Sequence, residues 1–73
     1  MVLGKDTREY LKAGIHLYDG YEAEYEVVSI ADVERGKVVT LKCIKSSIDW
    51  MPGRLIYRQP LSYYYGMKME EVK

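Results

Sequence analysis

The segment 33–39, with the sequence Val-Glu-Arg-Gly-Lys-Val-Val, constrains the fold of this chain more than any other part of the sequence. A glycine that follows two polar residues can adopt the positive backbone torsion that closes a tight hairpin. Apolar and β-branched residues stand on both sides of the polar residues, which is the pattern of two paired strands. The sequence therefore predicts an antiparallel hairpin that reverses direction at Gly36.

The residues before this turn alternate in polarity, which indicates a strand with one buried face. One side carries Tyr21, Ala23, Tyr25 and Val27, and the other carries Glu22, Glu24 and Glu26. The alternation changes phase at Val27 and Val28, which are both apolar. This change predicts either a bulge or strong bend at Val27 and Val28, which would keep Val28 and Ile30 on the side of the core, or a strand that is buried on both faces near its middle.

The return strand is expected over 37–45, with one apolar face made of Val39, Leu41 and Cys43. If Val33 lies opposite Val38, then Glu26 lies opposite Lys45. Opposite charges that face each other across two strands contribute about 0.2–1 kcal/mol each.

The C-terminal part predicts one or two further strands. Pro52-Gly53 favours a turn, so 46–53 is a connection, and 54–59 is a third strand that ends at Pro60. The expected inner face of this strand carries Leu55 and Tyr57, and its outer face carries Arg54, Ile56 and Arg58. In the segment 61–65, a short fourth strand would turn Leu61, Tyr63 and Tyr65 inward and Tyr64 outward.

The N-terminal part predicts a short helix over 6–13. Asp6 or Thr7 can cap it, Glu9 completes a capping box with Asp6, and Gly14 ends it. The residues expected to dock this helix on the sheet are Leu3, Tyr10 and Leu11.

These elements predict a single α+β domain over 1–73 that is mainly β. It consists of a short N-terminal helix followed by a twisted antiparallel meander of three to five strands. A sheet this small needs either closure or a covering helix. The strand pattern resembles small SH3-like and Sm-like barrels in architecture, so an SH3-like barrel and a helix-covered sheet are both consistent with the sequence. Architecture alone implies no function.

Several classes of protein are disfavoured by what the sequence lacks. Cys43 is the only cysteine and His16 the only histidine, too few for a structural zinc site, and the lone cysteine cannot form an intramolecular disulfide. The segment 1–10 has no apolar run of the kind found in a signal peptide, and no segment approaches the ~20 apolar residues of a membrane span. We expect a soluble, cytoplasmic protein that is not an enzyme, has no metal or cofactor, and does not contact a membrane.

The charges are unevenly divided along a chain whose net charge is zero. Residues 1–34 carry three basic and eight acidic side chains, a net charge of −5, and residues 35–73 carry eight basic and three acidic ones, a net charge of +5. This asymmetry is consistent with two halves that pair with each other, and also with a basic nucleic-acid surface.

The aromatic and basic residues of the C-terminal half suggest an interaction surface, because three adjacent tyrosines cannot all be buried in one strand. For a protein partner, which includes a second copy of the chain, the predicted surface comprises Trp50, Arg54, Tyr57, Arg58 and Tyr64. The alternative is a nucleic-acid surface that comprises Lys42, Lys45, Arg54, Arg58 and Tyr64. A homodimer could also form through an unpaired edge strand.

Overall fold

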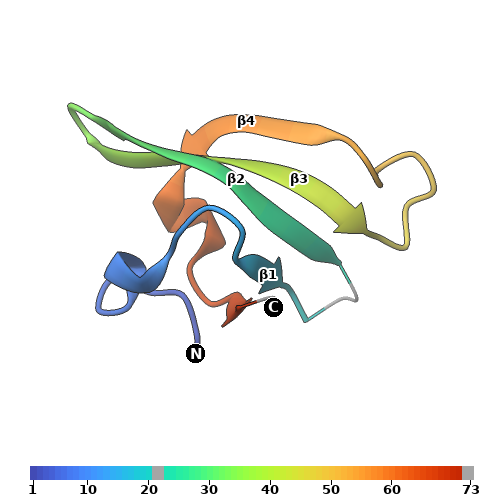
Figure 1. Cartoon of the computed structure of the whole chain (residues 1–73), viewed down its shortest axis with the longest axis horizontal. Helices are drawn as coiled ribbons and strands as arrows, with labels where there is room; N and C mark the ends of the chain where they lie inside the picture. Colours follow the sequence, from blue (N-terminus) through green and yellow to red (C-terminus); the bar gives the residue numbers. More distant parts are fainter. Residues whose placement is uncertain (21–22, 72–73) are drawn as a thin grey trace.

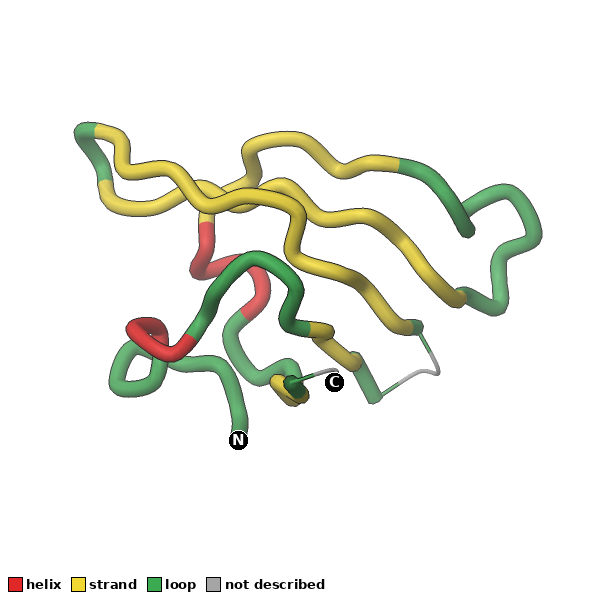
Figure 2. The backbone as a smooth tube through the Cα atoms, in the orientation of Figure 1, coloured by secondary structure: helices red, strands yellow, loops and turns green. Residues whose placement is uncertain are grey.

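The computed structural model describes residues 1–20 and 23–71, and these form one antiparallel sheet with two short 3-10 turns (Figures 1 and 2). The elements are η1 (Arg8–Tyr10), β1 (His16–Tyr18), β2 (Glu24–Val33), β3 (Gly36–Lys45), β4 (Leu55–Pro60), η2 (Leu61–Tyr64) and β5 (Lys68–Glu70). The strand order is β4-β3-β2-β1-β5. The prediction of a mainly β, antiparallel domain is confirmed.

The hairpin of β2 and β3 turns at Gly36, whose φ of +124° is positive as predicted. The register differs from the predicted one, because Val33 pairs with Gly36 and not with Val38. The turn is therefore only two residues long. Glu26 consequently lies opposite Lys42 and not Lys45. Glutamates still face lysines across the two strands, but with other partners.

The predicted bulge in β2 is confirmed and lies at Val28, but the expected burial of Val28 is wrong, because this side chain is 44% exposed. Val27 pairs with Leu41 and Ser29 pairs with Thr40, so Val28 is an extra residue without its own partner. In a regular strand without a bulge, Val27 and Ser29 would lie on the same, buried face. The bulge instead brings Ile30 onto the side of the core, while Ser29 stays exposed.

A second bulge, in β4, was not predicted. Ile56 pairs with Leu41 and Gln59 pairs with Val39, so two residues of β4, Tyr57 and Arg58, stand opposite the single residue Thr40. Arg58 has a φ of +47°, a left-handed conformation that residues other than glycine seldom adopt. Its backbone N–H donates a hydrogen bond of 3.2 Å to the hydroxyl of Thr40. Thr40 is buried, with bulges on both neighbouring strands.

The core lies on one side of the β2–β3 ribbon, where the N-terminal segment and the chain after β4 cover it (Figure 1). Its buried members are Leu3, Leu11, Leu17, Val27, Val39, Leu41, Leu61 and Met69. The predicted inner face of β3 is confirmed, because Val39, Leu41 and Cys43 are all fully buried. Tyr25 and Val27 lie on the core side as predicted, whereas the prediction for Tyr21 and Glu22 falls outside the described residues.

The predicted N-terminal helix is wrong, because only the single 3-10 turn η1 forms. The hydroxyl of Thr7 does not cap that turn. It accepts a hydrogen bond of 2.8 Å from the Gly4 N–H and donates one of 2.6 Å to the Val2 carbonyl. The segment is thus held by its own tight turn and by the burial of Leu3 and Leu11. Tyr10, which was expected to dock, is exposed.

The sheet is open, so closure into an SH3-like barrel is not confirmed. The predicted strand over 61–65 is also wrong, since Leu61–Tyr64 is the 3-10 turn η2 directly after Pro60. Beyond β5, the N-terminal residues extend the ladder: Leu3 donates its N–H to the Met67 carbonyl and Met69 donates to the Met1 carbonyl, both at 2.7 Å. Strand β4 forms the opposite edge of the sheet.

In the described part of the chain, no helix has the length and apolar character needed to cross a bilayer.

Two leucines on neighbouring strands give a direct test of this core. Leu41 is fully buried, whereas Leu55 is 41% exposed. We expect Leu41→Ala to lower the free energy of unfolding by about 2–5 kcal/mol, because it leaves a cavity in the core. The matched change Leu55→Ala should cost less than about 1 kcal/mol. Urea unfolding measures both, and equal losses would contradict the assignment of faces.

The left-handed residue of the β4 bulge gives a second test. We expect Arg58→Gly to be more stable than Arg58→Val by about 1–2 kcal/mol, because a β-branched side chain is strained at positive φ. At Tyr57, which lacks a positive φ, the order should reverse, since glycine weakens a strand. Thermal or urea unfolding measures the stability of the four variants. The same order of stability for glycine and valine at both positions would contradict the bulge.

Candidate functional site

Four of the five residues predicted to bind a protein partner lie within one segment. Trp50 stands in the loop between β3 and β4, Arg54 precedes β4, and Tyr57 and Arg58 form the β4 bulge. All four are exposed. Tyr64 is different, because it lies in η2 and packs against the core. The outward orientation predicted for Tyr64 is therefore wrong.

The loop residue Trp50 is held by Arg54. The guanidinium carbon of Arg54 lies 5.6 Å from the centre of the indole ring, within the range of a cation–π interaction. Its Nε also donates a hydrogen bond of 3.2 Å to the Trp50 carbonyl. The arginine thus lies over one part of the indole ring, and Trp50 remains 63% exposed.

The side-chain orientation along β4 is the reverse of the prediction. Ile56 packs against the core, while Leu55 and Tyr57 are exposed, Tyr57 to 63%. Leu55 pairs with Lys42, whose position in β3 lies between the buried Leu41 and Cys43. Because paired residues share a face of the sheet, Leu55 and Lys42 both lie on the face away from the core.

The observed side-chain orientation exposes apolar residues that were not part of the predicted binding surface. Ile44, Ile48 and Leu55 are exposed in the same β3–loop–β4 segment as Trp50 and Tyr57. A signal for them existed, since each is a large apolar residue in a basic segment, but the assumed phase of β4 turned Leu55 inward. We define the β3–β4 surface by Lys42, Ile44, Lys45, Ile48, Trp50, Arg54, Leu55, Tyr57 and Arg58.

The two lysines predicted for nucleic-acid binding, Lys42 and Lys45, are exposed on β3. They lie opposite Glu26 and Glu24 in the register of β2 and β3. Within residues 1–20 and 23–71, however, the ion pairs are His16–Glu24 and Lys37–Asp32. The ammonium groups of Lys42 and Lys45 are therefore available to an external partner.

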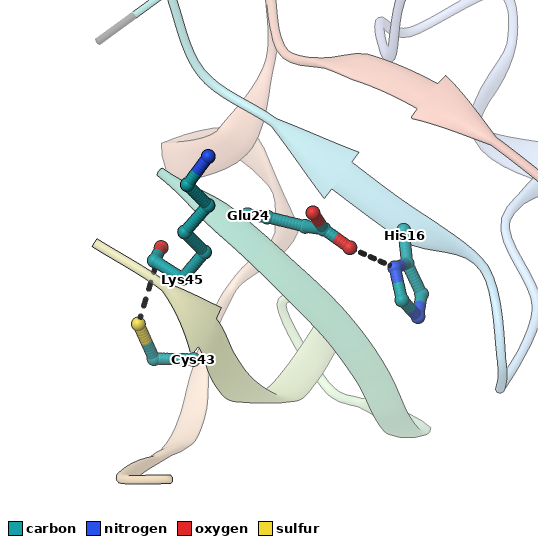
Figure 3. Close-up of polar contacts among 4 residues, drawn as sticks. All are labelled: His16, Glu24, Cys43 and Lys45. Atoms are coloured by element: carbon teal, nitrogen blue, oxygen red, sulfur yellow. Dashed lines mark hydrogen bonds and ion pairs between the residues drawn. The ribbon is translucent and has the colours of Figure 1, made fainter. Parts of the chain in front are cut away.

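The neighbouring part of the outer sheet face is acidic. Figure 3 shows the imidazole of His16, on β1, directed at the carboxylate of Glu24 on β2, and Nδ1 and Oε2 are 2.5 Å apart. Glu26 and Glu70 are the two residues in register with His16 on the flanking strands. The sequence does not reveal this pair, because only strand register brings the two positions together.

The side chains that could support metal or nucleophilic chemistry are dispersed. Cys43 is fully buried, its thiol donates a weak hydrogen bond of 3.6 Å to the Lys45 carbonyl (Figure 3), and burial raises its pKa. A buried thiol with a raised pKa is a poor nucleophile. Among the described residues, no group of three or more His, Cys, Asp or Glu side chains could hold a metal ion.

Two tyrosines packed against the core have raised pKa values. Burial is the main cause for Tyr64, and a nearby Tyr25 adds to it. Burial likewise raises the pKa of Tyr25, with Asp19 as the next contributor. The folded protein therefore favours the neutral phenols.

This environment predicts a loss of stability at alkaline pH. A pKa that is higher in the folded state contributes stability below the unfolded value of about 10, and the contribution is lost as the pH rises through the folded value. We expect Tyr64→Phe to reduce the decline in unfolding free energy above pH 10. The control is Tyr63→Phe, at a 70% exposed position, which should leave the decline unchanged. Unfolding curves between pH 8 and 11 give the free energy of unfolding of both variants. The same dependence on pH in both would contradict the placement of Tyr64.

Comparison with protein-family models, with curated proteins and with solved structures finds no significant match to this chain.

Proposed function

We propose that this chain is a non-enzymatic interaction module that binds a protein partner through the β3–β4 surface. The observation that carries the proposal is the concentration of exposed apolar side chains between Ile44 and Tyr57. A small domain buries a limited fraction of its surface, so isolated exposed apolar residues are ordinary. Five large ones in one hairpin, flanked by arginines, have the composition of a protein interface.

The residue types favour a protein partner over a nucleic acid. Single-stranded nucleic acids bind to aromatic rings on which bases stack. Tyr64, one predicted ring, packs against the core, and Arg54 already covers part of Trp50. Three of the exposed apolar residues are aliphatic and offer no stacking face: Ile44, Ile48 and Leu55.

Nucleic-acid binding remains the second candidate, because Lys42, Lys45, Arg54 and Arg58 are exposed in the same hairpin. Binding that neutralises several phosphates weakens steeply between 50 and 200 mM salt. A labelled single-stranded oligonucleotide, titrated at both salt concentrations, tests this candidate. Tight binding with a steep salt dependence, abolished by the double change Arg54→Glu and Arg58→Glu, would favour it over a protein partner.

Site-specific photocrosslinking tests the protein-binding proposal. A photoreactive phenylalanine analogue is placed at Tyr57 or, as the matched control, at Tyr63, which is exposed to a similar degree in η2. After irradiation in an extract of the native cells, we expect a discrete protein adduct from position 57 and none from position 63. Equal adducts at both positions, or an adduct only with nucleic acid, would contradict the proposal.

A further inference from the structure

We propose that the partner of this surface is a second copy of the chain, which packs face to face against the outer side of the sheet. This inference rests on the proposed function and names its partner. The sheet has one covered face, which carries the core, and one face on which no described element packs. On this outer face, Glu24 and Glu26 of β2 lie beside Lys45 and Lys42 of β3, so the two central strands carry complementary charges.

This arrangement of charges follows from the strand register. One row of outward residues runs across all five strands and consists of Glu70, His16, Glu26, Lys42 and Leu55. In the next row, Glu24 of β2 lies opposite Lys45 of β3, after a register shift between Glu24 and Tyr25. On the other side of Glu24, this row continues through Tyr18 of β1 to the exposed Lys68 of β5. The boundary between the glutamates and the lysines of the two central strands therefore runs between β2 and β3.

A two-fold axis parallel to the strands, placed over this boundary, makes the surface self-complementary. The rotation lays β3 of one copy over β2 of the other, so that Lys42 meets Glu26 of the second copy and Lys45 meets Glu24 of the second copy. Symmetry forms each contact twice. The same rotation lays Leu55 of β4 over His16 of the second copy, which covers an exposed leucine. Two sheets packed in this way form an aligned sandwich about 10 Å thick.

A stable interface would need only a modest part of the surface of the chain. A standard interface buries about 800 Å² on each partner. That is about 15% of the 5314 Å² that the chain exposes. The chain's net charge of zero, divided into halves of −5 and +5, also allows two copies to meet without overall repulsion.

Pairing through the free edge of β4, the mode that the sequence suggested, is disfavoured. The bulge at Arg58 twists this edge, and the side chain of Gln59 donates a hydrogen bond of 3.0 Å to the Tyr57 carbonyl. Pro60 lacks an N–H at the end of the strand. Bulges and prolines are common means by which sheet edges avoid pairing. The outer face of the sheet, on which no described element packs, is therefore the surface proposed for a second copy.

Charge reversal at one cross-copy contact tests the proposal. We expect the wild-type chain to sediment as a dimer, and we expect Lys42→Glu or Glu26→Lys alone to weaken the dimer at least ~10-fold, because each change places like charges together twice. An equimolar mixture of the two variants should restore a dimer that contains one copy of each. The double variant with both changes in one chain should also dimerise.

The double variant separates association from folding, because Glu26 and Lys42 also lie opposite each other within one chain. The matched control is Lys5→Glu, an exposed lysine before η1 in the N-terminal segment, which covers the core through Leu3 and Leu11. It should leave the dimer intact. Thermal unfolding of every variant verifies that the fold is retained.

Three results would overturn the inference: a monomer at all concentrations, a dimer that the single reversals leave unchanged, or single variants that fail to associate when mixed. Photocrosslinking at Tyr57 then distinguishes the failure of self-association from the failure of the proposed protein-binding function. An adduct with a different protein would leave the proposed function standing and remove self-association, whereas no adduct at all would remove both.

Discussion

The side-chain arrangement of the sheet depends on the pairing of two bulged strands with Thr40. Thr40 is a buried residue of the central hairpin, and each neighbouring strand sets two residues against it, Val28 and Ser29 on β2, and Tyr57 and Arg58 on β4. Its hydroxyl accepts the N–H of Arg58, which holds that residue in its left-handed conformation. Because an extra residue reverses the side-chain alternation of a strand, these two bulges decide which apolar residues enter the core.

The consequences of the two bulges extend to both faces. On the inner face, Val27 and Ile30 pack on the core from one strand, and Ile56 packs on it from another. On the outer face, Leu55 and Tyr57 are left exposed. The core is thin, and the segments that cover it are held by local turns and by main-chain hydrogen bonds to β5 instead of by a helix. A chain of this size has little further apolar surface with which to cover the second face.

The uneven charge along the sequence becomes a spatial pattern through strand order. The acidic segment supplies β1 and β2, and the basic segment supplies β3 and β4, so adjacent strands carry opposite charges at their shared boundary. Within the chain, this arrangement sets Glu26 opposite Lys42 without a close ion pair. Incomplete pairing inside one copy leaves these groups free for the intermolecular contacts proposed above. The same cations could bind a nucleic acid. The exposed apolar residues of the β3–β4 surface therefore favour a protein over a nucleic acid, and the glutamates of β2 beside the lysines of β3 favour a second copy as that protein.

The sequence by itself determined the local features of this protein. The strands of the hairpin, the turn at Gly36 and the buried face of β3 were predictable, because each depends on residues that are neighbours in the chain. The two adjacent apolar residues Val27 and Val28 indicated an irregularity in β2, and the pairing with β3 decided that it is a bulge at Val28. The positions of Arg54 and Arg58 at the surface were likewise predictable from their residue types. Only the tertiary structure decided the phase of β4, the inward position of Tyr64, the loss of the N-terminal helix and the contact between His16 and Glu24. Each of these depends on a partner distant in sequence: a bulge is defined by the strand opposite it, and a two-turn helix persists only when packing outweighs its cost of nucleation.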